Sequence, residues 1–336
     1  MTQTFEIAVI GATGTVGETL VQILEELEFP VGTLYLLAGS NSAGASVPFR
    51  GKNVRVKEVD TFDFSKVQLA FFAAGPAVTL SFAPRATAAG CAVIDLSGAL
   101  PAEQAPQVVP QANAHVLGAL KKPFQLGSPS PCATYLAVVL APLRNVVDIQ
   151  RVSVTANLAI SAQGREAVSE LARQTAELLN VRPLEPAFFD RQVAFNLLAQ
   201  VGTPDAQGHT ALEKRLVHEL RAVLETPLLK ISATCVQAPV FFGDSLTVSL
   251  QLAAPVDLAA VNRALDAAPG IELVEEGDYP TAVGDAVGQD VVYVGRVRAG
   301  IDDPAELNLW LTSDNVRKGS ALNAVELAQL LIKGLV

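Results

Sequence analysis

The sequence predicts an α/β fold in two parts: an N-terminal, Rossmann-like, doubly wound parallel sheet, followed by an α+β domain with a mixed sheet. Three observations support this prediction. Short apolar runs alternate with helical stretches from the start of the chain. A glycine-rich turn follows the first of these runs. Beyond residue 132 the pattern changes to longer strands and a long amphipathic helix.

The apolar runs of the N-terminal part are the expected strands of the parallel sheet. They cover residues 5–10, 32–37, 69–73 and 92–95, and later strands are expected at 107–109 and around Leu126. Helical patterns lie between them at residues 17–27 and 78–89. Strands that alternate with helices pair in parallel, and the helices cover both faces of the sheet.

The second part carries a different set of elements. Helices are expected at residues 133–143, 164–179 and 319–332, and strands at 151–158, 246–252, 291–297 and 306–311. The strand at 246–252 alternates apolar and polar residues, which is typical of a half-exposed antiparallel strand. The proline-bounded segment 183–199 is expected to be irregular.

Composition excludes several classes of protein. Half of the 336 residues are hydrophobic and 17% are charged, which favours a large core over disorder. The formal net charge of −10, without a Lys/Arg-rich stretch, argues against nucleic acid. The apolar stretch around residues 135–141 is too short to span a membrane, and the N-terminus lacks a signal-peptide pattern, so a cytoplasmic protein is expected. Cys91, Cys132 and Cys235 show no paired spacing, so neither a disulfide framework nor a metal site is expected.

The glycine-rich turn is a candidate phosphate loop. It reads Gly11-Ala12-Thr13-Gly14-Thr15-Val16-Gly17 and joins the first strand to the first helix. Glycines there allow a tight turn and let backbone N–H groups approach a pyrophosphate at the helix N-terminus. The loop predicts a site for NADP or NAD, with Gly11, Thr13, Gly14, Thr15 and Val16 as cofactor-binding residues. The alternative is a glycine turn of the same fold that binds no ligand.

The segment after the second strand bears on the choice of nucleotide. Residues 36–44 contain no Asp or Glu, which disfavours the ribose contact of an NAD site, and no Arg that would bind a 2′-phosphate. Ser40, Asn41 and Ser42 offer only neutral hydrogen bonds to such a phosphate. An ordinary polar loop is the alternative interpretation.

Cys132 is the candidate nucleophile. Ser130 is a suitable N-cap and Pro131 a suitable first residue for the apolar helix that follows, which places Cys132 in the first turn. The dipole and the N–H groups there would stabilise a thiolate, and the N–H groups would also stabilise an oxyanion. The alternative is a buried, inert cysteine, which we expect for Cys91 and Cys235.

Several stretches together resemble the aspartate-semialdehyde dehydrogenases. They include the glycine loop, residues 82–85, 93–95, 108–113, 161–167, 194–196, 234–236 and 279–281, and the run from Asp314 to Leu327. The resemblance implies a dinucleotide-binding domain at residues 1–131 plus 315–336 and a catalytic and dimerisation domain at 132–314. It also implies a homodimer, a small aldehyde or acyl substrate and a place in amino-acid biosynthesis.

In that family the cysteine attacks an aldehyde, a hydride passes to NADP and phosphate releases an acyl phosphate. The resemblance puts Cys132 at the nucleophile, but Asp244 stands where the family has its base histidine and Gln237 where it has a substrate arginine. Leu158, Pro101 and Asn41 likewise replace a glutamine, a phosphate arginine and the NADP arginine, and Pro131 replaces an asparagine. On the substrate side the resemblance keeps Glu213, has Arg215 where the family has a lysine, and adds Ser97. On the cofactor side it keeps Asn315, Lys318 and Gly319, to which Asn41 and Ser42 are added.

This pattern is most similar to the Usg-type paralogues of the family. It implies an NAD(P)-binding fold with the original dehydrogenase reaction impaired or absent. The alternative is an NAD(P)-dependent aldehyde oxidoreductase that uses Cys132 on a less anionic substrate, and a third hypothesis is aspartate-semialdehyde dehydrogenase activity itself. Asp244 would serve as a base only if burial raised its pKa. His209, four residues before Glu213, is either a displaced base or a solvated loop residue.

Overall fold

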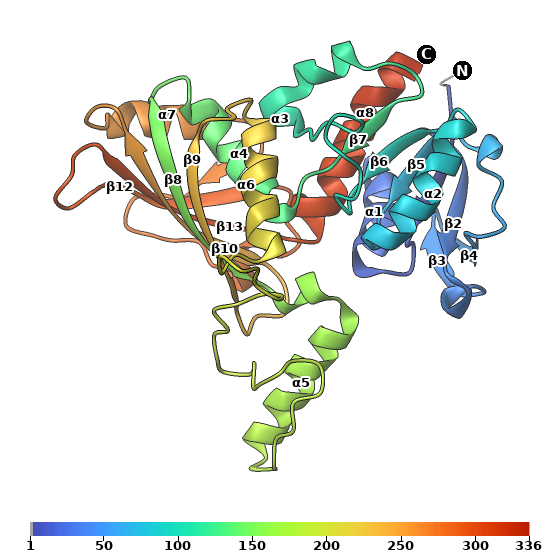
Figure 1. Ribbon diagram of the computed structural model, residues 1–336, viewed down its shortest axis with the longest axis horizontal. Helices are drawn as coiled ribbons and strands as arrows, with labels where there is room; N and C mark the ends of the chain where they lie inside the picture. Colours follow the sequence, from blue (N-terminus) through green and yellow to red (C-terminus); the bar gives the residue numbers. More distant parts are fainter. Residues whose placement is uncertain (1–2, 336) are drawn as a thin grey trace. The chain divides into compact units, whose positions relative to one another are not determined.

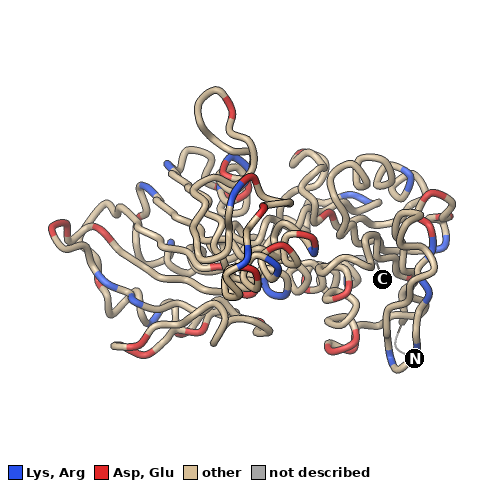
Figure 2. The backbone as a smooth tube through the Cα atoms, turned by 90° about the horizontal axis from the view of Figure 1, so that it is seen from below, with Lys and Arg blue, Asp and Glu red and all other residues tan. Residues whose placement is uncertain are grey.

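The computed structural model describes residues 3–335 and divides the chain into two compact units. Unit 1 contains the residues up to Ser130 together with the segment from Ser320 onwards, and unit 2 runs from Pro131 to Gly319. Figure 1 shows the elements of both units, which we describe separately. Acidic and basic residues are interspersed along the backbone of each unit (Figure 2). Within the described residues, no helix is long and apolar enough to cross a membrane.

Unit 1 is built on a seven-stranded sheet with the order β3-β4-β2-β1-β5-β6-β7. Its parallel strands are β1 (Phe5–Ile10), β2 (Val31–Ala38), β4 (Lys52–Glu58), β5 (Leu69–Phe72), β6 (Ala92–Asp95) and β7 (Gln125–Gly127). Only β3 (Ser46–Phe49) runs antiparallel, against β4. The helices are α1 (Thr15–Glu26), α2 (Pro76–Ala88), α3 (Pro110–Asn113) and α8 (Asn323–Leu335). The predicted parallel sheet is confirmed.

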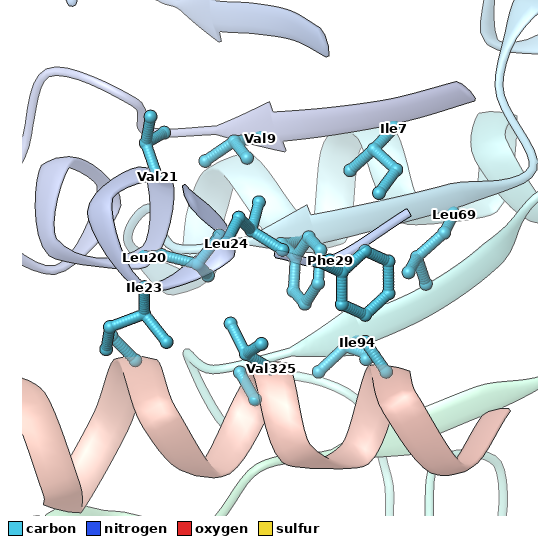
Figure 3. Close-up of a cluster of buried hydrophobic side chains, with 14 of the residues drawn as sticks. Ile7, Val9, Leu20, Val21, Ile23, Leu24, Phe29, Leu69, Ile94 and Val325 are labelled. Carbon is cyan, nitrogen blue, oxygen red and sulfur yellow. The ribbon is translucent and has the colours of Figure 1, made fainter. Parts of the chain in front are cut away.

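The core of unit 1 lies on both faces of this sheet, as the alternation of β1 requires. Ile7 and Val9 belong to one cluster, with α1 and α8, whereas Ala8 and Ile10 belong to another, with α2. Figure 3 shows Val325 of α8 beside residues of α1 and β6 in the first cluster. The segment that follows unit 2 in sequence therefore completes the core of unit 1.

The structure of unit 1 differs from the prediction in three places. The β3–β4 pair was not predicted, because the residues of β4 are mostly polar and exposed. Residues 107–109 are not a strand: Gln107 forms only an isolated bridge with Gly127. The C-terminal helix begins at Asn323 and not at residue 319, because a π-helical turn, Arg317–Leu322, precedes it.

Unit 2 contains a six-stranded mixed sheet with the order β11-β12-β13-β10-β8-β9. Its strands are β8 (Ile149–Leu158), β9 (Lys230–Gln237), β10 (Asp244–Leu252), β11 (Ile271–Leu273), β12 (Val292–Ala299) and β13 (Glu306–Ser313). The pairs β8–β9 and β11–β12 are parallel and the other pairs are antiparallel. In β10, Leu246 and Val248 are buried while Thr247 is exposed, which confirms the predicted half-exposed strand.

The helices of unit 2 fall into two groups. Helices α4 (Pro131–Leu143), α6 (Ala211–Val223) and α7 (Leu258–Asp266) pack with one another and with the strands. Helix α5 (Arg165–Leu179) instead projects away from the sheet (Figure 1), and the irregular segment 183–199 returns from it to a bridge between Leu198 and Gln237 of β9. We call residues 165–199 the arm.

Candidate functional site

The glycine loop has the geometry that a phosphate loop needs. Gly11 has a φ of +85°, and a Cβ there would lie 2.7 Å from the carbonyl oxygen of Ala73. A Cβ on Gly17 would lie 2.2 Å from the carbonyl oxygen of Gly11, so α1 packs closely on the loop. Gly14 is less crowded: a Cβ would meet only the Gly11 oxygen, at 3.3 Å. Gly14 is also the N-cap of α1 and makes no side-chain cap, which leaves this helix end suited to a pyrophosphate.

The loop after β2 offers neutral groups. Ser40–Ser42 form a 3₁₀ turn in which Asn41 is exposed and Ser42 half-buried. Sequence analysis did not single out Arg55 of β4, whose Nη2 lies 3.7 Å from the position of a Cβ on Gly44. A guanidinium therefore lies beside this loop, although the loop itself contains no arginine.

Ser97 belongs to a hydrogen-bond network in unit 1. Its hydroxyl donates to Asp95 Oδ1 at 2.6 Å and lies within hydrogen-bond distance of the Thr79 hydroxyl, with 3.0 Å between the two oxygens. Asp95 Oδ2 also accepts from the backbone N–H of Leu100 at 2.9 Å. These bonds shape the loop that follows β6, so Ser97 has a structural use that the resemblance did not indicate.

Unit 2 brings Cys132 and Asp244 into contact. Helix α4 begins at Pro131, as predicted, and Cys132 lies in its first turn with 6% of its surface exposed. The Cys132 thiol donates to Asp244 Oδ2 with an Sγ–Oδ2 distance of 3.8 Å. Asp244, the first residue of β10, is 1% exposed, and its Oδ1 accepts from the backbone N–H of Ala159 at 2.8 Å.

The ionisation of this pair differs from the expectation of a stabilised thiolate. Burial, followed by the charge of Asp244, raises the pKa of the Cys132 thiol well above its ordinary value. The predicted depression of this pKa by the helix N-terminus is therefore wrong in this environment. Burial also raises the pKa of Asp244 to about 7, although the hydrogen bonds from Ala159 and Cys132 act in the opposite direction. Asp244 is thus the member of the pair that changes charge near neutral pH.

Gln237 ends β9 in a buried position. Its Nε2 donates to the carbonyl oxygen of Leu158 at 2.7 Å, while Oε1 makes no hydrogen bond with any described residue. Where the family would have an arginine that binds a carboxylate through paired hydrogen bonds, this chain therefore has a neutral amide whose nitrogen donates to a backbone carbonyl.

The other residues expected on the substrate side are engaged in local contacts. Glu213 forms a capping box at the start of α6, where Oε2 accepts from Thr210 N at 2.8 Å, and its Oε1 accepts from Cys235 N at 3.0 Å. Arg215 pairs with Glu219 at 2.7 Å. The side chain of His209 is exposed in the preceding loop, as the solvated-loop interpretation expects.

The run from Asp314 to Gly319 supports the turn that carries Asp244. Asn315 Oδ1 accepts from the backbone N–H of Gly243 at 3.0 Å, and its Nδ2 lies 3.0 Å from Ser161 Oγ. Lys318 is buried. A Cβ on Gly319 would lie 2.5 Å from the hydroxyl of Tyr135, so that position requires glycine. Sequence analysis did not single out Tyr135, because its side chain reads as one more large residue of an apolar helix.

Among residues 3–335, no three His, Cys, Asp or Glu side chains are grouped so that they could hold a metal ion. All three cysteines are buried and free. The polar chemistry of unit 2 is therefore centred on Cys132, Asp244 and the side chains around them.

Comparison with known proteins gives consistent matches over the whole chain. Residues 6–120 match the model described as the NAD binding domain of semialdehyde dehydrogenases, and residues 140–318 match the semialdehyde dehydrogenase dimerisation domain. A USG-1 protein homolog from Azotobacter vinelandii is 60% identical over 333 residues, which cover 99% of each chain.

Two solved structures are also similar. One, of a probable aspartate-semialdehyde dehydrogenase from Pseudomonas aeruginosa, has a TM-score of 0.97 and 58% identity and covers 99% of this chain and 100% of that one. The other, of aspartate semialdehyde dehydrogenase II from Vibrio cholerae complexed with ASA, has a TM-score of 0.96 and 40% identity and covers 99% of each chain.

Proposed function

Because the chain belongs to the semialdehyde dehydrogenase family, we propose that it is an NAD(P)-binding paralogue in which the aspartate-semialdehyde dehydrogenase reaction is impaired or lost. The observation that carries this proposal is the contact between Cys132 and Asp244, 3.8 Å apart. A cationic partner lowers the pKa of a thiol, whereas a neighbouring carboxylate raises it. The sulfur at the nucleophile position is therefore held as a neutral thiol, which is a weaker nucleophile than a thiolate.

The side chains around the Cys132–Asp244 pair also fit a loss of affinity for the anionic substrate. A substrate carboxylate is held best by the paired donors of an arginine. Gln237 supplies a neutral amide, and its nitrogen already donates to Leu158. Glu213, with both carboxylate oxygens accepting backbone N–H groups, stabilises α6 and β9. We infer that aspartate semialdehyde would bind weakly here.

The glycine loop supports the cofactor part of the proposal. Gly11, Gly14 and the first turn of α1 would hold the pyrophosphate, because their backbone approaches without side chains. A bound nicotinamide nucleotide would supply hydride-transfer chemistry. Asn41 and Ser42 would face the ribose with neutral groups, so we propose NAD(P) without assigning one of the two nucleotides.

A second candidate is an oxidoreductase that acts on a less anionic aldehyde. It is favoured by the pKa of Asp244, which burial raises to about 7, close to the value that suits a general base at neutral pH. In this reading Asp244 Oδ2 takes the Cys132 proton as the sulfur attacks a carbonyl carbon. The carboxylate would then do part of the work of the missing histidine.

The domain roles follow from the same family. We propose residues 1–131 plus 315–336 as the nucleotide domain and 132–314 as the domain that forms a homodimer, in line with the dimerisation-domain match at 140–318. Three buried free cysteines fit a reducing compartment, so we propose a cytoplasmic protein.

The test of the proposed function introduces the histidine and the arginine that the family has at positions 244 and 237. The wild type, Asp244→His, Gln237→Arg and the double variant are assayed for NADP reduction with aspartate semialdehyde and phosphate, and for NAD and NADP reduction with propionaldehyde. We expect the wild type to match Cys132→Ser on aspartate semialdehyde. The double variant should exceed it by roughly 100-fold, the scale of a restored general base.

Each outcome separates the candidates. A wild type that oxidises aspartate semialdehyde as fast as the Vibrio cholerae enzyme, assayed alongside, would refute impairment. Turnover of propionaldehyde that disappears in both Cys132→Ser and Asp244→Asn would establish the second candidate. NADPH and NADH titrations of the same samples check that every variant keeps its nucleotide site.

A further inference from the structure

Tyr135 is a fully buried phenol in unit 2, three residues after Cys132 on α4. Its hydroxyl makes no hydrogen bond with any residue between 3 and 335. Buried hydroxyl groups nearly always have a partner, because leaving one unpaired is unfavourable. The position of Tyr135 beside the candidate nucleophile suggests that its partner arrives with a ligand.

The hydroxyl lies at the N-terminal end of α4. A Cβ on Gly319 would be 2.5 Å from Tyr135 Oη and 2.6 Å from Pro131 Cβ, so the hydroxyl and the first residue of the helix are neighbours. Long side chains on a helix lean towards its N-terminus, and residues three apart share a face. The Tyr135 hydroxyl therefore lies beside the first turn of α4, which contains Cys132.

Hydrogen-bond donors thus gather at one end of the helix. The N–H groups of the first turn have no acceptor four residues earlier within the helix and favour negative charge. Burial, followed by the charge of Asp244, raises the pKa of Tyr135 well above its ordinary value, so the phenol stays a neutral donor. Asp244, as the acceptor, contacts the sulfur itself.

We propose that Tyr135 donates a hydrogen bond to the carbonyl oxygen of the molecule that reacts at Cys132, and that this molecule is an aldehyde without a negative charge beside the carbonyl. The proposal rests on the second candidate function, in which Cys132 is the nucleophile, and names the substrate class of that site. Cys132 is itself only 6% exposed, so a molecule that reaches its sulfur must displace the side chains that cover it. A carboxylate close to Asp244 would add a second anion to a buried site, which is unfavourable.

The step is balanced without any other reactant. The Cys132 sulfur forms a bond to the carbonyl carbon, and the thiol proton passes to Asp244 Oδ2. The carbonyl π pair moves to the oxygen, which becomes negative and accepts the hydrogen bond from Tyr135 and from the helix N-terminus. The result is a thiohemiacetal anion, and proton return from Asp244 neutralises it.

The test measures aldehyde binding at Cys132 without nucleotide or turnover, so it is independent of whether the protein is a dehydrogenase. Cys132 is alkylated with allyl bromide, which has no oxygen, and the modification is followed by mass spectrometry at increasing propionaldehyde concentrations. We expect propionaldehyde to protect the thiol. In Tyr135→Phe, half-protection should need roughly threefold to tenfold more aldehyde, the size of one hydrogen bond, with the protection of each protein measured against its own alkylation rate without aldehyde.

Controls address folding and charge. Thr226→Val removes another buried hydroxyl that has no hydrogen-bond partner among the described residues, at a different place in unit 2, and should leave protection unchanged. Succinic semialdehyde, which carries a carboxylate, should protect the wild type less than propionaldehyde does. Equal half-protection in the wild type and Tyr135→Phe, or no protection of the wild type by propionaldehyde, would overturn the proposal. A thermal midpoint of Tyr135→Phe at or above that of the wild type shows that the variant is folded.

Discussion

At the residue level, Asp244 combines a cost in stability with a candidate chemical role. Asp244 is 1% exposed, and within the described part of the chain its carboxyl group accepts an N–H and a thiol, which compensate incompletely for the loss of water. Its pKa is about 7 in the folded protein, compared with 3.8 for an ordinary Asp. Between these values the folded state keeps a proton that the unfolded state releases, so stability falls as the pH rises.

This linkage predicts the effect of Asp244→Asn. The variant should be more stable than the wild type, with a difference that is near zero at pH 4, grows up to about pH 7 and is then constant. At about 1.4 kcal/mol for each unit by which the pKa is raised, the difference in unfolding free energy between the two proteins is at most roughly 4 kcal/mol. Urea unfolding of both proteins at several pH values measures this difference.

Asp205→Asn is the control with the opposite sign. Hydrogen bonds from Lys214 and from the backbone lower the pKa of Asp205 to about 2. This variant should therefore be less stable than the wild type at neutral pH, and the difference should vanish as the pH falls from about 4 to about 2. A gain for Asp244→Asn that does not depend on pH would contradict the raised pKa.

The position of Cys132 could be predicted from the sequence, whereas its ionisation could not. Pro131 and Cys132 begin α4 as predicted, because capping and proline rules act within a few residues. The pKa of Cys132 depends first on burial and then on Asp244, a residue far away in sequence that is brought near by β10, and local rules contain neither. Glu213 was assigned to the substrate side by resemblance, but its carboxylate is used by the capping box of α6.

At the level of elements, the β1–α1 loop contains two kinds of glycine. Some are required because a side chain would clash with the neighbouring backbone, whereas one leaves room for a ligand. Gly17→Ala would place a Cβ 2.2 Å from the Gly11 oxygen and force α1 outwards. We expect this variant to lose roughly 1–3 kcal/mol of stability, the usual range for overpacking, together with NAD(P) binding. Thermal unfolding and NADPH fluorescence titration measure the two effects.

Gly14→Ala is the matched variant in the same loop. Its φ of −77° suits alanine, and the added Cβ meets only one atom, at 3.3 Å. We expect nearly unchanged stability but clearly weaker nucleotide binding, because the methyl group would stand at the end of α1 where the pyrophosphate approaches. Unchanged NADPH binding in Gly14→Ala would show that the nucleotide does not use this loop.

Elements with a strong local pattern were predicted closely, and those fixed by tertiary contacts were not. The buried strands β1 and β6 match their predicted ranges, since continuous apolar runs are unambiguous between turns. β4 escaped prediction because only Val56 among its residues is fully buried. The late start of α8 reflects the π-helical turn before it, for which the sequence has no separate signal.

At the level of the whole molecule, the predicted relationship to aspartate-semialdehyde dehydrogenases is confirmed by matches that cover almost the entire chain. The dimerisation-domain match includes the arm of unit 2, residues 165–199. The arm exposes Val181 by 93% and Phe195 by 66%. Both have positive φ values, of 55° and 58°, which are unfavourable for such side chains. We propose that a second copy of the chain covers them.

This proposal predicts the effect of placing asparagine at both positions. Asparagine tolerates positive φ, so Val181→Asn with Phe195→Asn should leave the monomer as stable as before or more stable. It should also raise the dimer dissociation constant at least about tenfold, since buried aromatic residues dominate many interfaces. Sedimentation over a range of concentrations measures the association.

Ile301→Asn provides the matched control, because Ile301 is fully exposed in the loop between β12 and β13, outside the arm. It should leave the dimer unchanged. Weaker association in Ile301→Asn, with normal association in the arm variant, would move the interface to that loop. A wild type that sediments as a monomer at micromolar concentration would contradict the homodimer itself.

The return of α8 to unit 1 has a consequence for how the protein is made. The first cluster of unit 1 needs Val325 and Leu327, which the ribosome adds only after all of unit 2. While unit 2 is being translated, the apolar faces of β1 and α1 lack the residues of α8 that complete this cluster. Unit 2, whose strands all come from one continuous stretch, has no such delay. The order of maturation is thus reversed relative to the order of synthesis: the part of the chain made first is the part finished last.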